Sequence, residues 1–277
     1  MRITANYRRK GYTELDRTRH THTDQYEIIQ VQNHGGNVLV GSTLYPMTAG
    51  GLYLIHAEHI HMTNPEEADT YVRSIVKFSI RECRALLDCL GAEELSSLLF
   101  GSGTDADFSG RYIPLSGGRA EEADAFFFRL SSGRQGEASY RSVHILLDFL
   151  DFISECADHA AALRPAQTGD RITTELLKLI EAHSKEKLTL DRLSGMVNVS
   201  KFHMCRVFQK DTDMTISAYI TLCRLSAVRK LLTETTLPIA AAAQESGFSS
   251  YPNFCAVFRK YVNMTPNEYR KRFSSRE

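Results

Sequence analysis

The fold of the C-terminal part is decided by the stretch Ala243-Gln-Glu-Ser-Gly-Phe-Ser-Ser-Tyr-Pro-Asn-Phe-Cys-Ala-Val-Phe-Arg-Lys260. Its last six residues repeat, with two differences, the segment Cys205-Arg-Val-Phe-Gln-Lys210 found fifty residues earlier. Met214-Thr215 recurs as Met264-Thr265 at the same offset. Two copies are too few for a solenoid, which needs at least three repeats to bury a continuous core. The repeat therefore predicts two copies of one small helical module.

Each copy has the pattern of two short helices joined by a tight turn. In the first copy Thr189 is a cap for one helix and Ser200 for a second that runs to about Lys210. The apolar residues of that second helix recur at i, i+3 and i+4, which predicts a single buried stripe. Asp213 follows, and this residue type tolerates the left-handed conformation that ends a helix. The first copy is therefore predicted to be helix, turn, helix.

The second copy carries the same signals in other residues. Pro238 begins its first helix, Gly247 makes the turn, Ser249 or Ser250 caps the next helix, and Asn263 ends it. Residues 216–233 between the copies are predicted to form one connecting helix. A short helix that projects from a small three-helix core can enter a DNA major groove, although many helix pairs serve only for packing.

The charge of the chain is divided unevenly along its length. Lys and Arg number 33, and so do Asp and Glu, but residues 1–169 hold 16 basic and 22 acidic residues, whereas residues 170–277 hold 17 and 11. The net charges of −6 and +6 favour one acidic domain and one domain able to meet phosphate, while two solvated surfaces of opposite sign remain the alternative. Residues 164–169 contain the Pro and Gly expected of a short linker.

Composition excludes several classes of protein. Hydrophobic residues make up 43% and charged residues 24%, which argues against a disordered or fibrous chain. No run of about 18 apolar residues predicts a membrane span, and the first residues do not have the pattern of a secretory signal. The six cysteines show no CxxC pairing, which favours a reduced chain over a disulfide scaffold or a zinc finger. We therefore expect a cytoplasmic protein without a membrane partner.

Residues 172–273 resemble the DNA-binding domain of the AraC/XylS transcription regulators. The positions that match the signature of the second helix-turn-helix and its C-terminal extension are Gly247, Phe248, Phe254, Phe258, Lys260, Pro266, Tyr269 and Arg270. The chain departs from the family pattern at Ala242, Asp213, Pro252, Ala256 and Asn263. The resemblance implies two helix-turn-helix units on a linker helix, which present their second helices to successive major grooves about 34 Å apart.

The resemblance also implies which side chains meet DNA. The base-reading positions are Phe202, Cys205, Arg206, Tyr251, Asn253 and Ala256. The phosphate-contacting positions, which add affinity without sequence information, are Ser200, Lys201, Lys210, Ser250, Arg259 and Lys260. Arg206 is the preferred base reader because a guanidinium can bond guanine O6 and N7 together, the alternative being a surface arginine paired with a carboxylate. Asn253 either reads adenine or caps a turn.

The acidic half has the alternation of β-strands. The segments with this pattern are Tyr26–Gln32, Asn37–Leu44, Leu52–Ile55 and Tyr71–Phe78, and short strands with Gly-rich turns favour a barrel or sandwich. His20, His22, Glu27 and His61 resemble the metal pattern of the cupin barrel, which is common in the sensory half of this family. Residues i and i+2 of a strand share a face, so both early histidines could point into the barrel as metal donors.

Three interpretations of these four residues remain open: polar groups of a pocket for an organic effector, which is favoured; a bound metal; or a vestigial pocket. No cofactor is predicted. Two amphipathic helices, over residues 140–163 and 121–130, are expected to pack against the barrel and, by the resemblance, to form a homodimer. Residues 101–119 are Gly/Ser-rich and predicted to be a loop.

These observations predict a multidomain α+β protein. Residues 1–163 form a cupin-like sensor and dimerisation domain, residues 164–170 a linker, and residues 171–277 an AraC-type DNA-binding domain. The predicted function is that of a transcription regulator, an activator rather than an enzyme, whose partners are double-stranded DNA, a small-molecule effector, RNA polymerase and a second copy of the chain. The alternatives are a cupin metalloenzyme that uses the four residues above, or a regulator that needs no ligand.

Overall fold

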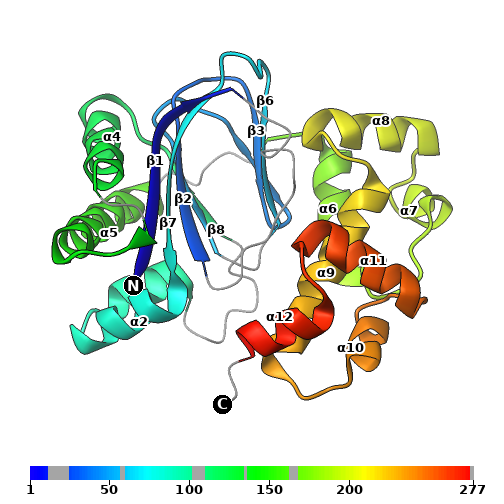
Figure 1. Cartoon of the computed structure of the whole chain (residues 1–277). Coiled ribbons are helices and arrows are strands. Elements are labelled where there is room, and N and C mark those ends of the chain that lie inside the picture. The colour runs from blue at the N-terminus through cyan, green and yellow to red at the C-terminus, as the bar shows by residue number, and fades with distance from the viewer. Residues whose placement is uncertain (12–24, 57–59, 102–109, 134–135, 162–167, 275–277) are drawn as a thin grey trace.

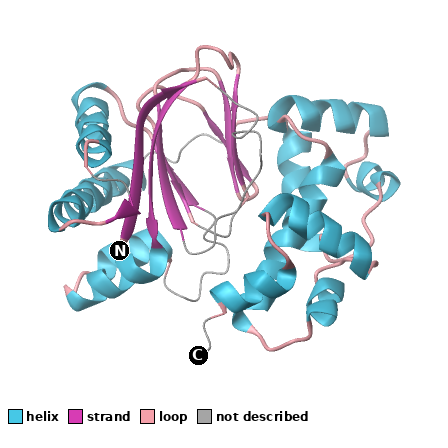
Figure 2. Ribbon diagram, viewed as in Figure 1, coloured by secondary structure: helices cyan, strands magenta, loops and turns pink. Residues whose placement is uncertain are grey.

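The computed structural model describes residues 1–11, 25–56, 60–101, 110–133, 136–161 and 168–274. Its elements lie in four layers (Figure 1): helices, a six-stranded sheet, a three-stranded sheet and the C-terminal helices. Figure 2 shows the same view by secondary structure, with all described strands in the N-terminal half. Within the described residues no helix is long and apolar enough to cross a membrane.

The six-stranded sheet is antiparallel throughout. Its strands, in spatial order, are β8 (Gly110–Ile113), β5 (Leu52–Ile55), β2 (Gln25–Val31), β7 (Val72–Ser79), β1 (Arg2–Lys10) and β9 (Gly136–Glu137). One face is covered by the N-terminal helices α2 (Ile80–Cys89), α3 (Glu93–Phe100), α4 (Gly117–Ser131) and α5 (Tyr140–Ala161), which bury a large apolar core against it. Side chains alternate along each strand, so the other face builds a second core toward the three-stranded sheet.

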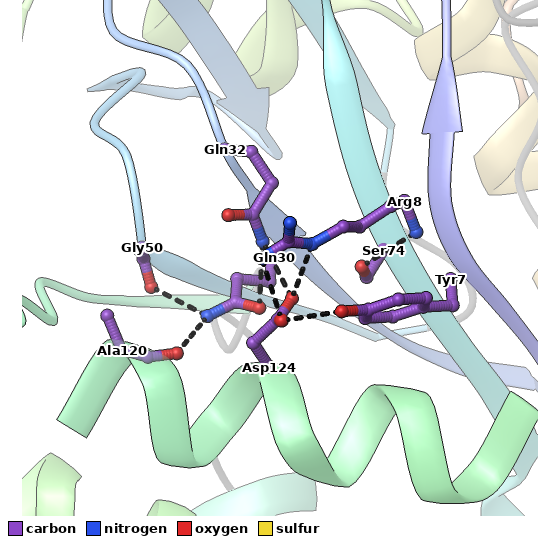
Figure 3. A network of polar contacts seen from close by, with 8 residues as sticks. All are labelled: Tyr7, Arg8, Gln30, Gln32, Gly50, Ser74, Ala120 and Asp124. Atoms are coloured by element: carbon purple, nitrogen blue, oxygen red, sulfur yellow. Dashed lines mark hydrogen bonds and ion pairs between the residues drawn. The ribbon is translucent and has the colours of Figure 1, made fainter. Parts of the chain in front are cut away.

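A polar network fixes α4 to the sheet (Figure 3). Asp124 of α4 accepts hydrogen bonds from the Tyr7 hydroxyl at 2.8 Å, from Arg8 Nη2 at 2.9 Å and from Gln32 Nε2 at 3.1 Å. Gln30 Nε2 donates to the Ala120 carbonyl at 2.9 Å. These bonds satisfy polar groups that the helix covers, so they set where α4 lies on β1 and β2.

The three-stranded sheet consists of β4 (Thr43–Pro46), β3 (Gly36–Val40) and β6 (His61–Pro65) in that order. The strand predicted over residues 37–44 is thus broken into two, because Gly41 adopts a φ of +59° and turns the chain. Within the described residues the two sheets are not joined into one closed barrel, so the predicted barrel is not confirmed. The coarser prediction of a mixed α and β protein is confirmed.

Two other expectations need correction. Residues 101–119 are not simply a loop: β8 pairs with β5 over Gly110–Ile113, and α4 begins at Gly117, where two glycines hide the helix signal. The helix predicted over 121–130 is therefore longer at both ends. The helix expected over 140–163 is described as Tyr140–Ala161, and residues 162 and 163 lie outside the described residues.

The C-terminal region is built of helices alone, within the part that the structure describes. These are α6 (Arg171–His183), α7 (Leu190–Met196), α8 (Lys201–Thr212), α9 (Ile216–Glu234), α10 (Ile239–Glu245), α11 (Tyr251–Val262) and α12 (Pro266–Phe273). The connecting helix predicted over 216–233 is α9, to within one residue. One apolar cluster forms around α6, α7, α8 and the first half of α9, and another around the second half of α9 with α10, α11 and α12.

Candidate nucleic-acid interface

The first unit is α7, a turn and α8, which we call unit 1. Thr189 Oγ1 accepts the Arg192 amide at 3.2 Å and Ser200 Oγ accepts the His203 amide at 3.3 Å, so both predicted caps are confirmed. The turn between the helices contains Asn198, whose φ is +53°. These side-chain caps satisfy amides that would otherwise have no partner at each helix start, and they fix the entry of the chain into α8.

The second unit, α10, a turn and α11, follows the same plan, and we call it unit 2. Ser250 Oγ accepts the Asn253 amide at 3.4 Å, and Gly247 makes the turn with a φ of +89°. Pro238 is the residue that precedes α10 rather than its first residue. Asp213 and Asn263 end the two second helices in the left-handed conformation, as predicted from their residue types.

Helix α9 belongs to both units at once. Its first half buries Ile216, Tyr219 and Leu222 in the cluster of unit 1, and its second half buries Val228 and Leu232 in that of unit 2. A single helix cannot shift in one core without moving in the other, because packed interiors have little free space. Helix α9 therefore joins the two units as one rod.

A second contact also joins the two units, and no pattern in the sequence predicts it. Arg224 of α9 donates from Nε to the Ser184 carbonyl at 2.7 Å and from Nη2 to the Glu186 carbonyl at 2.9 Å, in the loop between α6 and α7. Gly247 of unit 2 lies against this point: a Cβ there would be 2.8 Å from the Lys185 carbonyl oxygen and 2.9 Å from Arg224 Nε. The turn of unit 2 thus rests on the loop that leads into unit 1, and this contact holds the two units in one orientation.

Comparison with known proteins supports this architecture. Residues 193–272 match a family described as a helix-turn-helix domain. Over 97 residues the chain is 36% identical to the HTH-type transcriptional regulator GbdR of Pseudomonas aeruginosa, and over 98 residues 33% identical to the melibiose operon regulatory protein of Escherichia coli. Residues 193–272 therefore form a helix-turn-helix domain, and over about a third of its length the chain is similar to these two regulators.

The matches to these two relatives cover only part of each chain. They cover 35% of this chain in both cases, and 26% and 32% of the two relatives, so the chain spans between a quarter and a third of their length. The solved C-terminal domain of AraT, a response regulator from Geobacillus stearothermophilus, is 27% identical and covers 39% of this chain and 90% of that one, with a TM-score of 0.38. The names of the two curated relatives are those of a transcriptional regulator and of an operon regulatory protein.

The base-reading positions predicted on α8 lie on its solvent-exposed side. Met204 and Phe208 are fully buried, whereas Phe202 is 79% exposed and Arg206 is also exposed. No carboxylate among the described residues lies within ion-pair distance of Arg206, which leaves its guanidinium available to a ligand. Cys205 is half-buried beside them.

The base-reading positions on α11 are also accessible. Tyr251 is 46% exposed, and Asn253 and Ala256 are exposed, while Phe254 and Phe258 are buried beneath them. A hydrogen bond with the Cys255 thiol raises the pKa of the Tyr251 hydroxyl. Asn253 lies in the first turn of α11. Its backbone N–H donates the cap hydrogen bond to Ser250 Oγ.

The predicted phosphate contacts divide into three groups. Lys210, Arg259 and Lys260 are exposed near the ends of their helices. Lys201 Nζ lies 2.8 Å from Asp191 Oδ1, so it would have to leave an exposed ion pair of small energy to reach DNA. The hydroxyls of Ser200 and Ser250 accept the cap hydrogen bonds and keep a donor for phosphate. The DNA roles of all these residues remain predictions.

The predicted effector residues are described in part. Glu27 Oε2 lies 3.3 Å from His61 Nε2, across the gap between the two sheets, and 3.2 Å from Lys77 Nζ on the adjacent strand. Lys77 was missed because only the strand register places it opposite Glu27. His20 and His22 lie outside the described residues. Among the residues that are described, no group of three or more His, Cys, Asp and Glu could hold a metal.

Proposed function

We propose that this chain is a sequence-specific transcription regulator that binds double-stranded DNA through α8 and α11. The observation that carries the proposal is the helix-turn-helix domain, in which two capped helices with exposed faces are held by one rod and by the Arg224 contact. A helix-turn-helix places the first residues of its second helix against base edges in the major groove. Rigid spacing of two such helices would let one chain read two adjacent groove segments.

Within this proposal, Arg206 reads a guanine and is the main source of base specificity. Phe202 and Cys205 flank it on α8. On α11 the readers are Tyr251, Asn253 and Ala256, of which the last offers only a methyl contact. The phosphate contacts come from Ser200, Lys201, Lys210, Ser250, Arg259 and Lys260.

The N-terminal half supports the remainder of the proposal. Glu27, His61 and Lys77 place a carboxylate, an imidazole and an ammonium group around the interior between the sheets, a suitable set for orienting a small polar effector. A homodimer would use the outer faces of α4 and α5, where Phe128 is 54% and Tyr140 is 89% exposed. We propose further that the dimer acts in the cytoplasm as an activator that contacts RNA polymerase.

Selection of bound fragments from a genomic DNA library, with and without candidate metabolites, tests the proposal. We expect a small set of related sequences, and an affinity that falls steeply with added salt. Failure to enrich any sequence would contradict the proposed function.

Arg206→Ala sharpens the same test. On the selected site we expect a loss of about 1–3 kcal/mol in binding free energy and relaxed preference at one base pair, because a bidentate contact is removed. Gln209→Ala, on the same exposed side of α8, is the matched control and should change binding little. Equal losses for Arg206→Ala on selected and random DNA would assign Arg206 to the phosphate backbone instead.

A further inference from the structure

The two halves of the chain share one buried apolar cluster. Leu39 of β3, Leu44 of β4 and Met62 of β6 pack with the buried residues of α6, α8 and α9. Figure 1 shows β3 and β6 beside α6 and α8. Since these strand residues are at most 5% exposed, the outer face of the three-stranded sheet is a docking surface for unit 1.

Polar side chains of this sheet complete the C-terminal end of α8. Asn37 of β3 and Asn64 of β6 are partners in the strand register. Asn64 Nδ2 donates to the carbonyls of Lys210 and Asp211 at 3.2 and 3.3 Å, and Asn37 Nδ2 donates to the latter at 3.5 Å. The last carbonyls of a helix have no partner within the helix, so a cap from elsewhere stabilises it. We call these two asparagines and the two carbonyls the asparagine clasp.

The residues just before α6 are hydrogen-bonded to the same sheet and to the end of α8. The amide of Thr168 donates to the Leu44 carbonyl at 3.0 Å, and its hydroxyl donates to Asn37 Oδ1 at 2.7 Å. The carboxylate of Asp211, only 9% exposed as a residue, accepts the Asp170 amide at 2.8 Å. The sheet, the start of the DNA-binding domain and the end of its first reading helix are thus held together by one set of hydrogen bonds.

Strand β6 also has an inner face. Successive side chains of a strand point to opposite sides, so His61 and Thr63 face away from Met62 and Asn64. On that inner side His61 meets Glu27 of the six-stranded sheet at 3.3 Å. A five-residue strand therefore carries part of the proposed effector site on one side and the asparagine clasp on the other.

We propose that β6 transmits occupancy of the N-terminal interior to the first reading helix. This inference rests on the effector control proposed above. A small polar molecule that separates His61 from Glu27 would shift β6 and loosen the asparagine clasp, which changes how firmly α8 is held. The shift can only be as large as the difference in the molecule's affinity for the two positions of β6. Within the part of the chain that the structure describes, unit 2 makes no comparable contact with the sheets. An effector would therefore act on DNA binding through unit 1.

Hydrogen–deuterium exchange of the full chain, read by mass spectrometry, tests the clasp and the transmission separately. Asn64→Ala should make the amides of residues 208–214 exchange about fivefold faster, because it removes a cap worth roughly one hydrogen bond. Residues 258–264, the matching segment of unit 2, serve as the internal control and should not change. Unaltered exchange at 208–214 would contradict the clasp.

Glu27→Gln tests the transmission because it alters only the inner side of the fold. We expect faster exchange at 208–214 as well as at 61–65. If exchange becomes faster at residues 61–65 but is unchanged at residues 208–214, the transmission is overturned and the clasp is not. Lys77→Met perturbs the same cluster from the opposite strand and replaces Glu27→Gln if that variant does not fold by circular dichroism.

A DNA measurement separates this inference from the proposed function. If the original chain selects DNA fragments, Asn64→Ala should change the affinity for them by about fivefold or more, a modest coupling between sites. An unchanged affinity would overturn the control of unit 1, whereas failure of the original chain to select DNA would overturn the proposed function and leave the exchange experiments as the test of the clasp.

Discussion

The two helix-turn-helix units share their caps and buried stripes but differ in what holds them. Unit 1 shares its core with the three-stranded sheet, and its second helix ends in the asparagine clasp. Unit 2 builds its core from its own helices and α9. The sequence repeat predicts two copies of one helical module, but it carries no signal that unit 1 packs against the sheet. Repeated local signals can produce the same helices while the surroundings give those helices different roles.

The largest difference in behaviour between the two units should come from substitutions at their matched core positions, Phe208 and Phe258. Both are fully buried, and replacing either with alanine should cost about 3–5 kcal/mol in the free energy of unfolding. Phe208→Ala should also speed exchange in β3 and β6, since its cluster includes the sheet, whereas Phe258→Ala should not. Thermal unfolding and hydrogen exchange measure the two effects. Equal exchange in β3 and β6 for both variants would contradict the unequal docking.

A smaller effect should follow from the contact between the units. Gly247→Ala forces a Cβ toward the Lys185 carbonyl and requires an alanine at a φ of +89°, so we expect a loss of about 1–3 kcal/mol in stability. Gly195→Ala in α7 is the matched control, because its Cβ would meet nothing within 4 Å and helical Gly→Ala changes usually stabilise. If Gly247→Ala were as stable as the control, the units would not rest on each other.

The smallest difference concerns the helices that follow each unit. Thr265 and Glu268 form a capping box at the start of α12, but the matching positions at the start of α9 are Thr215 and Ala218. Hydrogen bonds from the Thr265 amide and hydroxyl lower the pKa of Glu268. A lowered pKa means that the folded state is favoured above the ordinary Glu value of about 4.3 and loses this contribution as the pH falls below it.

Glu268→Gln should therefore flatten the acid side of the stability curve, measured as melting temperature between pH 3 and pH 6. Ala218→Glu tests the converse: it supplies the missing partner and should stabilise the chain by about 0.3–1.5 kcal/mol at neutral pH. A curve for Glu268→Gln that falls as steeply below pH 4.3 as that of the original chain would show that the charge of Glu268 contributes nothing to stability.

The sequence predicts the contacts between residues that are close together in the chain, and it misses the contacts between residues that are far apart. Ser200, Ser250 and Asn263 could be assigned because a cap or a left-handed turn depends on a few adjacent residues. Arg224 and Asn64 could not, since their partners lie 38 residues or more away in the chain. Lys77 joins Glu27 through strand register, which the alternation of side chains alone does not fix.

We propose that both reading helices are held as one body against the same side of a duplex. Hydroxyl-radical footprinting of the full chain on a selected fragment tests this directly. We predict two protected patches on one face, with centres about 10–10.5 base pairs apart. A single patch, or two patches on opposite faces of the helix, would contradict it.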